Sequence, residues 1–576
     1  MTNMIDLKEF SSKSIDSEFY LPLPKNYEIG KTKYIIVTGS VMSGIGKGTF
    51  TSCLGTLLKC HGFNITMLKF DGYLNYDAGT LNPYRHGEVF VLDDGTECDL
   101  DLGSYERFTN QNYSKENYLT SGKIFKTIIE KERRGEFLGR DVQFIPHVTG
   151  EIKMFLRNLA NLSKADIVLV EVGGTVGDLE NAYFLEALRE MKYEEGNNIC
   201  FINVTYIIEP NFLGEQKSKP AQLGIRKLHE IGIQPDIIVC RSNGEIKKSV
   251  KEKISLFSNV PFKRIFEIKN VDNVYKIPFY LKYQGIDNAI FEILGIQPKE
   301  NKNDMTFEKW KSFANLFDKI NKKITVAIAG KYVDVQDSYI SIIKALEHTS
   351  PYYNAKPEIK WINSEGLELL SKEELENKLK EIFSDVDGLI IPGGFGKRGI
   401  EGKIACVKYA RENDIPFLGI CLGFQVALIE FARNVCGLKN ANSTEFDLFT
   451  ENPVVDLLEE QKRIEGLGGT MRLGGKDVEI IEGTLAYKLY KKRIVRERFR
   501  HRYECNPKYI KMFEDFGIVF SGKAPNSNIM QILEIPKNKF FIATQFHPEF
   551  TSKPLSPNPI FKGFVEECVK SEKNEI

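Results

Sequence analysis

The sequence predicts an α/β protein with two doubly wound, Rossmann-like parallel-sheet domains. Short apolar runs alternate with helix-like stretches in both halves of the chain, as in strand–helix–strand units. A glycine-rich loop, Gly39–Gly48, follows the first apolar run, and parallel sheets bind ligands at loops that follow their strands. With 576 residues, the chain is also too long for one hydrophobic core and needs two or three domains.

The first half supplies an amino-terminal domain, predicted over residues 32–300. Residues 1–31 are polar and lack periodicity, so we expect a flexible extension before it. The domain opens with the strand Tyr34–Thr38, the glycine loop and a helix over Thr49–Cys60. Later apolar runs predict further strands at Asn64–Lys69, Ile167–Glu171, Ile199–Ile208 and Asp236–Cys240.

The second half supplies a carboxyl-terminal domain, predicted over residues 324–566. A helical connector rich in lysine and asparagine precedes it, and we assign residues 301–323 as the linker. Residues 567–576 form a tail. The strands of this domain are predicted at Ile324–Gly330, Gly388–Gly394 and Phe417–Cys421.

Composition excludes several classes of protein. The chain has 78 basic and 78 acidic residues, so its overall charge does not indicate a nucleic-acid binder. Ten cysteines without metal-ligand spacing fit a reducing compartment. The first twenty residues lack the apolar core of a signal peptide, and no stretch of about 18 apolar residues predicts a membrane span. We therefore expect a cytoplasmic protein.

The glycine loop has the features of a phosphate cradle. It lies between a predicted strand and a predicted helix, where backbone N–H groups and the positive helix end attract anions. Lys47 would reach the outer phosphates. The loop is not a strict P-loop, because Gly48 follows the lysine where Ser or Thr is expected. A merely tight turn is the alternative.

Charged residues follow the neighbouring strands. Lys69 ends one strand, and the segments Asp99–Gly103 and Val170–Asp178 supply carboxylates at loops or strand ends. Magnesium bound to a triphosphate needs one or two such oxygens. Solvated turn residues are the alternative, but Glu171 follows four apolar residues directly before two glycines.

A cysteine in the second half has the setting of a nucleophile. Cys421 lies between glycines at a predicted strand–turn–helix junction, which favours the reactive thiolate at a helix N-terminus. Far downstream, alternation along a strand would place His547 and Glu549 on the same side, so that the carboxylate orients an activating imidazole. Taken singly, a buried cysteine is more often inert and a histidine beside proline structural.

These motifs resemble known families. The Gly-x-Cys-x-Gly elbow and the His-Pro-Glu tail resemble the class I glutamine amidotransferase domain. From about Lys33 to Lys562, the chain resembles CTP synthase. The stretches that carry this resemblance include Gly44–Gly48, Tyr84–Phe90, Asp99–Phe108, Glu171–Asp178, Gly214–Pro220, Tyr275–Pro278, Pro392–Gly396, Ala441–Glu445, Leu467–Gly474, Arg500–Glu504 and Gln545–Glu549.

The resemblance implies an activity and its ligands. The family is a ligase of pyrimidine nucleotide synthesis: ATP phosphorylates the uracil 4-oxygen of UTP, and ammonia released from glutamine displaces the phosphate. GTP activates the family and CTP inhibits it. The resemblance further implies Mg²⁺ as cofactor, ATP, UTP and glutamine as small-molecule substrates, a homotetramer that is able to form filaments, and no nucleic-acid or membrane partner.

The resemblance also implies residue roles in the amino-terminal half. The ATP site would comprise Gly44, Ile45, Gly46, Lys47, Gly48, Thr49, Lys69, Asp101, Arg241 and Val271, with Asp101 and Glu171 as magnesium ligands. The UTP or CTP site would comprise Ser43, Asp178, Leu179, Glu180, Lys217, Ser218, Lys219, Pro220, Ala221, Gln222 and Lys253. The ammonia passage would run near His86 and Val89.

In the carboxyl-terminal half, the resemblance implies catalysis by Cys421, His547 and Glu549, and a GTP response at Arg398 and the Gly468–Leu473 lid. Glutamine would be bound by Gly394, Leu422, Gly423, Phe424, Gln425, Glu445 and Arg502.

Two departures and two alternatives accompany this interpretation. Asn270 stands where the family commonly has aspartate, and the stretch between Pro453 and Gly466 is shorter than usual. A cobyrinate-type amidase is the enzymatic alternative, but it gives no reason for Gly214–Pro220 or for the acidic Asp99–Asp101 loop. A filament or scaffold without catalysis is the other alternative, although the candidate catalytic residues are present.

Overall fold

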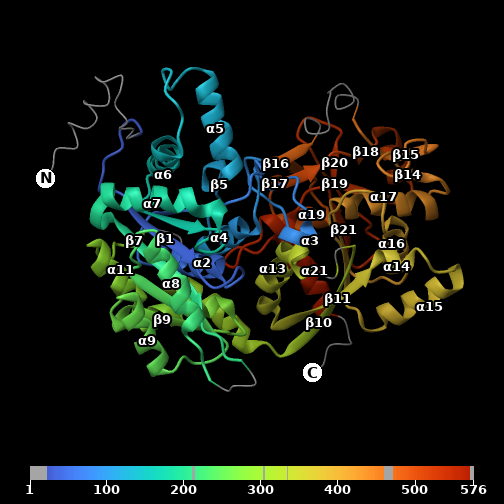
Figure 1. Ribbon diagram of the computed structural model, residues 1–576. Coiled ribbons are helices and arrows are strands. Elements are labelled where there is room, and N and C mark those ends of the chain that lie inside the picture. Colours follow the sequence, from blue (N-terminus) through green and yellow to red (C-terminus); the bar gives the residue numbers. More distant parts are fainter. Residues whose placement is uncertain are drawn as a thin grey trace. The chain divides into compact units, whose positions relative to one another are not determined.

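The computed structural model describes residues 23–210, 215–302, 305–331, 333, 335–458 and 471–570 (Figure 1). Two compact units divide the chain. The first contains residues 1–80 and 104–314, and the second contains residues 81–103 and 315–576. The units thus follow the two halves of the sequence, except that the segment 81–103 belongs with the carboxyl-terminal half. The domain limits predicted from the sequence placed residues 81–103 in the amino-terminal domain.

The first unit is built on a parallel sheet of seven strands, in the order β5-β2-β6-β1-β7-β8-β9. This confirms the predicted α/β class. All its strand pairs are parallel, and the strands predicted from the sequence are present within a few residues. Their bounds are β1 Lys33–Gly39, β2 Ile65–Asp71, β5 Tyr118–Thr120, β6 Ile167–Val172, β7 Ile199–Tyr206, β8 Ile237–Ser242 and β9 Ile265–Lys269.

Helices cover both faces of this sheet. One core lies between the sheet and α5 Ser121–Arg133, α6 Thr149–Ser163 and α7 Ala182–Glu195. On the same face, α8 Lys219–Glu230 and α9 Lys248–Ser258 enclose a smaller core over β8. The other helices of the unit are α2 Lys47–Cys60, α10 Ile277–Gln284, α11 Ile286–Leu294, α12 Phe307–Ala314 and α4 Leu100–Thr109, which begins in the second unit.

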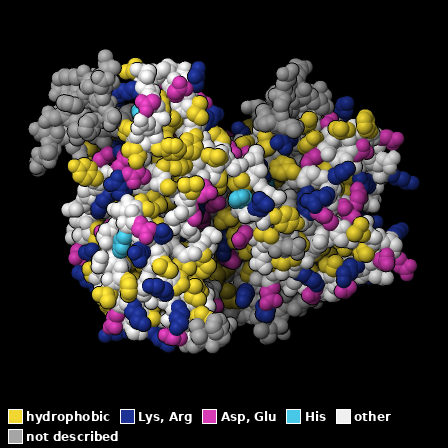
Figure 2. Space-filling view, viewed as in Figure 1, with side chains coloured by type: hydrophobic (Ala, Val, Ile, Leu, Met, Phe, Trp, Pro, Cys, Tyr) yellow, Lys and Arg dark blue, Asp and Glu magenta, His cyan; other side chains and the backbone are white. Residues whose placement is uncertain are grey.

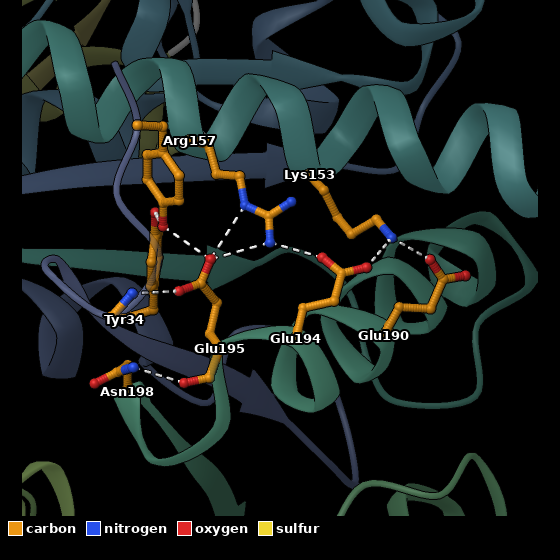
Figure 3. A network of polar contacts seen from close by, with 9 residues as sticks. Tyr34, Lys153, Arg157, Glu190, Glu194, Glu195 and Asn198 are labelled. Atoms are coloured by element: carbon orange, nitrogen blue, oxygen red, sulfur yellow. Dashed lines mark hydrogen bonds and ion pairs between the residues drawn. The ribbon is translucent and has the colours of Figure 1, made fainter. Parts of the chain in front are cut away.

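A buried ionic network ties the segment before β1 to this core (Figure 3). Arg157 of α6 donates to Glu194 at 2.6 Å and to Glu195 at 3.1 Å. The hydroxyl of Tyr27 donates to Glu195 at 2.9 Å, and the backbone N–H of Gly30 donates to the same carboxylate at 3.1 Å. Residues 23–31, which we had assigned to the flexible extension, are therefore anchored; residues 1–22 lie outside the described part of the chain.

The second unit contains a nine-stranded sheet, in the order β11-β10-β12-β13-β21-β20-β19-β16-β17. The strands from β11 to β21 are parallel, as predicted, whereas those from β21 to β17 pair antiparallel. The predicted parallel sheet is therefore present in this half, and four antiparallel strands that were not predicted extend it. The bounds are β10 Lys322–Gly330, β11 Ala355–Asn363, β12 Gly388–Ile391, β13 Phe417–Ile420, β16 Arg472–Ile480, β17 Ile494–His501, β19 Val519–Lys523, β20 Met530–Glu534 and β21 Phe541–Thr544.

Two hydrophobic cores hold this sheet between helices. One contains α15 Lys372–Ile382, α16 Ile400–Glu412 and α17 Leu422–Asn434. The other contains α13 Ile340–Thr349, α19 Leu485–Tyr490 and α21 Pro559–Val569. The remaining elements are α3 Pro83–His86, α14 Ser364–Leu367, α20 Ile510–Asp515, a three-stranded sheet of β14 Ala441–Ser443, β15 Asn452–Asp456 and β18 Glu504–Cys505, and the pair β3 Phe90–Val91 and β4 Glu97–Cys98.

The surface agrees with the balanced charge of the sequence. On the face shown in Figure 2, basic and acidic side chains are interspersed and do not separate by sign. Within the described ranges, the longest apolar helices fall short of what crossing a bilayer requires.

We predict that Arg157→Met lowers the free energy of unfolding of the first unit by about 3–5 kcal/mol, because it leaves the buried Glu195 carboxylate without its cation, whereas Glu194 keeps Lys153. Urea unfolding would measure this change. Arg226→Met is the matched control, since Arg226 forms an exposed ion pair with Glu230 and its loss should change nothing measurable. Equal stability of the two variants would contradict a structural role for the network.

Candidate active sites

Cys421 occupies a sharp elbow between β13 and α17, as predicted. Its backbone has φ 53° and ψ −96°, a left-handed conformation that a non-glycine residue rarely adopts. The backbone N–H of Cys421 donates to the Thr544 carbonyl of β21 at 2.7 Å, which fixes the elbow against the neighbouring strand. The Sγ atom lies 3.6 Å from the carbonyl oxygen of Arg500. The elbow therefore presents the thiol at the start of a helix, where the backbone N–H groups favour a negative charge.

His547 and Glu549 meet, but not in the predicted way. Both residues were predicted to lie on a strand. Strand β21 instead ends at Thr544, and the two residues flank Pro548 at a 3₁₀ turn. The Nδ1 atom of His547 is 2.7 Å from an Oε atom of Glu549, and both side chains are buried. Among the described residues, Nε2 of His547 has no hydrogen-bond partner. That nitrogen is thus available to exchange a proton with a nearby group.

The electrostatics of this group favour a charged imidazole. Burial alone disfavours the imidazolium, but the Glu549 carboxylate and the Cys421 sulfur outweigh it and raise the pKa of His547 to about 10. A Cβ atom at Gly393 would lie 2.8 Å from Cε1 of His547 and 3.6 Å from Cβ of Cys421, so only glycine fits beside both residues. Cysteine, histidine and glutamate therefore form one buried constellation, of the kind that activates a thiol nucleophile.

The loop after β12 borders this constellation. The side-chain Nζ of Lys331 donates to the Phe395 carbonyl, and the backbone N–H of Gly396 donates to Glu445 at 2.7 Å. Burial raises the pKa of Glu445 and lowers the pKa of Lys331. The guanidinium of Arg502 lies 5.8 Å from the centre of the Phe395 ring. The structure thus brings Glu445 and Arg502 to the loop that carries Gly394.

The remaining residues assigned to glutamine start α17. Leu422, Gly423, Phe424 and Gln425 form its first turn, behind the Cys421 elbow. The side chain of Gln425 donates to the Tyr503 carbonyl at 2.9 Å. This bond connects the nucleophile helix to the segment that carries Arg502.

A buried lysine lies on the helix that follows the loop. Lys403, in the first turn of α16, is fully enclosed, and burial together with the charge of Lys331 lowers its pKa to about 7. Glu368 and Glu365 partly oppose this effect. Within the described part of the chain, no hydrogen bond from its ammonium group is found. Lys403 is not explained by the predicted chemistry.

The glycine loop of the first unit begins α2, as predicted. Gly46 caps this helix with φ 84°, and Lys47 is buried with its Nζ donating to the Gly174 carbonyl at 2.5 Å. A Cβ atom at Gly46 would lie 2.3 Å from an Nη atom of Arg241, so the guanidinium lies directly against the loop. The same guanidinium donates to the side-chain oxygen of Asn270 at 3.0 Å. The loop, Arg241 and Asn270 therefore form one group, with Ser43 exposed at its rim.

A second group of charges lies at the ends of β2 and β6. Lys69 pairs with Glu171 at 3.0 Å, and the hydroxyl of Tyr105 donates to the other oxygen of that carboxylate. Asp71 lies 3.9 Å from the ammonium group of Lys69 and accepts a bond from Tyr73 at 3.0 Å. These groups are buried, so water and salt screen the interactions between their charges only weakly.

An open cavity of about 710 Å³ adjoins these residues. Asp178 and Glu180, both predicted, line it together with Asp71 and Asn181, which were not. Asp178 accepts from the N–H of Thr175 at 2.6 Å and from its hydroxyl at 2.7 Å, which fixes the loop. The backbone N–H of Val176 donates to the Gly39 carbonyl at 2.8 Å, which joins the segment that carries Asp178 to the start of the glycine loop.

Helix α8 carries several residues predicted to bind UTP. A Cβ atom at Gly224 would lie 2.3 Å from Cβ of Ser40, so the helix packs directly against the glycine loop. Gln222 donates to Ser218 at 3.0 Å, and Lys217 pairs with Glu215 at 2.7 Å. Lys219 is exposed at the helix start, and Lys253 is exposed on α9. The lysines therefore surround the start of α8, beside the loop.

Several predicted residues belong to the second unit. Asp101 lies in the first turn of α4, and its backbone N–H donates to Asp99 at 2.9 Å. His86 is exposed at the end of α3, and Val89 is buried. Arg398 pairs with Glu365 at 3.4 Å. Of the predicted lid, residues 468–470 lie outside the described part of the chain, and Arg472 pairs with Glu504 at 2.8 Å.

Sequence reasoning missed Asp71, Tyr105 and Lys331. Asp71 follows Lys69 by two residues, so strand alternation places both on one side, and this signal was available. Lys331 follows the first strand of its half directly, which is also a recognisable ligand position. Tyr105 had no such signal, because it reaches Glu171 from a helix that is distant in sequence.

Comparisons with known proteins identify the family to which each half of the chain is similar. A model of the CTP synthase N-terminus matches residues 33–296, and a model of class I glutamine amidotransferases matches residues 334–567. The chain is 50% identical over 546 residues to a CTP synthase of Pyrococcus abyssi, covering 94% of this chain and 99% of the relative. It is 47% identical over 541 residues to a CTP synthase of Bacillus subtilis, with the same coverages. Among solved structures, it is similar to the glutaminase domain of Trypanosoma brucei CTPS with bound acivicin, at 36% identity and a TM-score of 0.41, covering 43% of this chain and 95% of that one.

We predict that Glu549→Gln moves the pH profile of thiol alkylation at Cys421 to higher pH. Glu549 raises the pKa of His547, so its neutral replacement lowers that pKa and weakens the positive charge beside the thiol. Iodoacetamide labelling between about pH 5.5 and 9.5, read by mass spectrometry of the Cys421 peptide, measures the profile. Glu412→Gln, at an exposed carboxylate, is the control; identical profiles for both variants would contradict the assignment.

We predict that Lys403→Met stabilises the second unit at neutral pH. In the folded protein the pKa of Lys403 is about 7, below the ordinary lysine value. Between about pH 7 and 10 the unfolded chain therefore binds one proton more than the folded chain. The free energy of unfolding of the wild type thus rises with pH in this range. The variant should therefore gain on the order of 3 kcal/mol near pH 7, and the gain should disappear toward pH 10. Urea unfolding at several pH values measures it. Lys408→Met, exposed on the same helix, should show no such slope.

Proposed function

The chain belongs to the CTP synthase family of glutamine-hydrolysing ligases, and on that premise we propose that it converts UTP to CTP in two coupled half-reactions. In one, glutamine is hydrolysed to glutamate and ammonia. In the other, ATP phosphorylates the 4-oxygen of UTP, and ammonia then displaces phosphate to give CTP, ADP and inorganic phosphate. The observation that carries the proposal is the buried Cys421, His547 and Glu549 constellation in the same chain as a lysine-bearing phosphate loop.

The amidotransferase half-reaction uses the thiol as nucleophile. Cys421 attacks the glutamine amide, and His547 gives the departing ammonia a proton while Glu549 keeps the imidazole oriented. A thioester remains on Cys421 and is hydrolysed by water that His547 deprotonates. The backbone N–H groups of Gly394 and Leu422 are placed to bind the developing oxyanion, an effect worth about 3–4 kcal/mol. Glu445 and Arg502 bind the charged amino-acid end of glutamine.

The synthase half-reaction relies on position and charge. The N–H groups of the glycine loop and the Lys47 ammonium hold the ATP phosphates, while Lys69 stabilises negative charge on the transferring phosphoryl group. Arg241 and Val271 lie on the adenine side. Because Asn270 already accepts a bond from Arg241, it serves here in the place of the aspartate common in the family.

Magnesium fits the donors that these residues supply. Asp101 and Glu171 offer carboxylate oxygens, the ligands that Mg²⁺ prefers, and one or two carboxylates suffice when phosphates and water complete the shell. One oxygen of Glu171 pairs with Lys69, and the other accepts a hydrogen bond from Tyr105. When bound, the ion would neutralise charge on the triphosphate. The side chains described here then orient the nucleotide.

The pyrimidine nucleotide would bind beside the cavity of Asp178 and Glu180. Lys217, Lys219 and Lys253 supply the positive charge for its triphosphate around the start of α8. We propose that CTP competes there as an inhibitor, that GTP promotes hydrolysis through Arg398 and the 468–473 segment, and that ammonia passes His86 and Val89. We also propose a cytoplasmic homotetramer.

We predict that Cys421→Ala abolishes CTP formation from glutamine but leaves formation from ammonium chloride intact. Lys47→Ala should lower CTP formation from both nitrogen sources by on the order of 10²–10³, since it removes charge stabilisation in the shared step. The change in absorbance as UTP becomes CTP measures both. Cys436→Ala and Lys248→Ala are matched controls, being a cysteine outside the site and an exposed lysine.

Ammonia-driven synthesis that survives Lys47→Ala would contradict the assignment of the glycine loop. Loss of both reactions in a folded Cys421→Ala variant would contradict two separable half-reactions. A wild-type protein that is silent with both nitrogen sources would reject the proposed function as a whole.

A further inference from the structure

The hairpin of residues 90–98 belongs to the second unit, although its sequence lies among the synthase motifs. Its strands β3 and β4 pair antiparallel, and Gly95 closes the turn by donating to the Leu92 carbonyl at 3.0 Å. The hairpin is outside every predicted site. The partner against which it packs, β17, is the strand that borders the Cys421 and His547 constellation.

Strand β17 presents alternate arginines to the hairpin. Arg496 forms a two-point ion pair with Asp93, with both distances at 2.9 Å. Arg498 is buried and donates to the Val91 carbonyl at 3.0 Å. Because side chains alternate along a strand, Arg496, Arg498 and the next arginine, Arg500, lie on one face. The backbone N–H of Gly475 on β16 also donates to the Asp93 carbonyl at 2.7 Å.

Arg500 connects the hairpin to the nucleophile. Its guanidinium donates to Glu97 at 2.6 Å and lies 5.1 Å from the centre of the Phe395 ring, in the loop of Gly394. Its own carbonyl oxygen is the atom that lies 3.6 Å from the Sγ of Cys421. A shift of Arg500 would therefore move a dipole that directly faces the sulfur.

A second route reaches the imidazole. The backbone N–H of His547 donates to the Arg498 carbonyl at 2.8 Å. The His547 ring stacks on Phe550 at 4.8 Å, Phe550 meets Phe90 edge-on at 5.1 Å, and the Arg498 guanidinium lies 5.4 Å from the Phe90 ring centre. The hairpin thus supports the histidine both through the strand backbone and through an aromatic column.

We propose that the 90–98 hairpin is a positioning element of the amidotransferase site, which sets the placement of Cys421 and His547 through Arg498 and Arg500. Glu97 and Phe90 are its positioning residues, and neither touches glutamine. The inference rests on the proposed glutamine hydrolysis for its kinetic consequence. The placement of the thiol against the imidazole is itself measurable without any substrate.

The test uses Glu97→Ala and Phe90→Ala in the full chain. Glu482→Ala is the matched control, because Glu482 forms an equally short, exposed ion pair with Arg493 of the second unit, away from the hairpin. The hairpin variants should lower the iodoacetamide labelling rate of Cys421 at neutral pH and move its pH profile upward. They should also lower kcat for glutamine hydrolysis by on the order of tenfold or more, with KM within about twofold.

Glu97→Asp should restore most of the labelling rate, since it keeps a carboxylate for Arg500. A labelling profile equal to that of wild type in folded Glu97→Ala would overturn the inference. If Phe90→Ala fails to fold, Glu97→Ala alone decides, because its side chain is outside the aromatic core. A protein that makes no CTP but shows the labelling shift would reject the proposed function and keep the positioning role.

Discussion

The conformation of Cys421 is the constraint on which the amidotransferase site depends. A positive φ at a non-glycine residue costs roughly 1–3 kcal/mol, and it persists only where the surrounding structure enforces it. Here β13 pairs with β21 up to the elbow, the Thr544 carbonyl holds the Cys421 N–H, and α17 begins at the next residue. Because His547 follows β21 by three residues, the strand that holds the elbow also delivers the imidazole. The sheet pairing therefore places nucleophile and base together before any ligand binds.

The burial of charged side chains is the second constraint. In both units, buried charges are paired with side chains of opposite charge. Lys69 is held between Glu171 and Asp71, while His547 is held against Glu549. In a medium of low dielectric, an unpaired charge strongly destabilises the fold. The charged side chains of the candidate sites are therefore paired with groups of opposite charge. Lys403, in the described part of the second unit, lacks such a partner. Its ammonium group finds no carboxylate within bonding distance, and its proton affinity falls accordingly.

Much of the fold was predictable, because it follows from periodicity. The strands of the parallel sheets were found from apolar runs, and Cys421 and Lys47 from loops that follow them. The antiparallel half of the second sheet was not, since strands such as β17 carry arginines on one face and read as polar segments. Local pattern also failed at His547 and Glu549, because β21 already ends at Thr544 and a turn at Pro548 brings the two side chains together. Contacts such as that of Tyr105 with Glu171 depend on tertiary packing that no local signal records.

The discontinuous second unit has a consequence for how the two half-reactions share one chain. The segment 81–103 lies between β2 and the remaining strands of the first unit, yet it is grouped with the unit that carries Cys421. Its hairpin is bound by Asp93 and Glu97 to the arginines of β17, and its end continues directly into α4, where Asp101 lies in the first turn. An acidic residue proposed for the synthase chemistry is thus joined by a few residues of chain to the hairpin, and the hairpin in turn contacts the strand that borders the thiol. The order of residues along this segment therefore connects a candidate synthase residue, Asp101, with contacts of the candidate amidotransferase site.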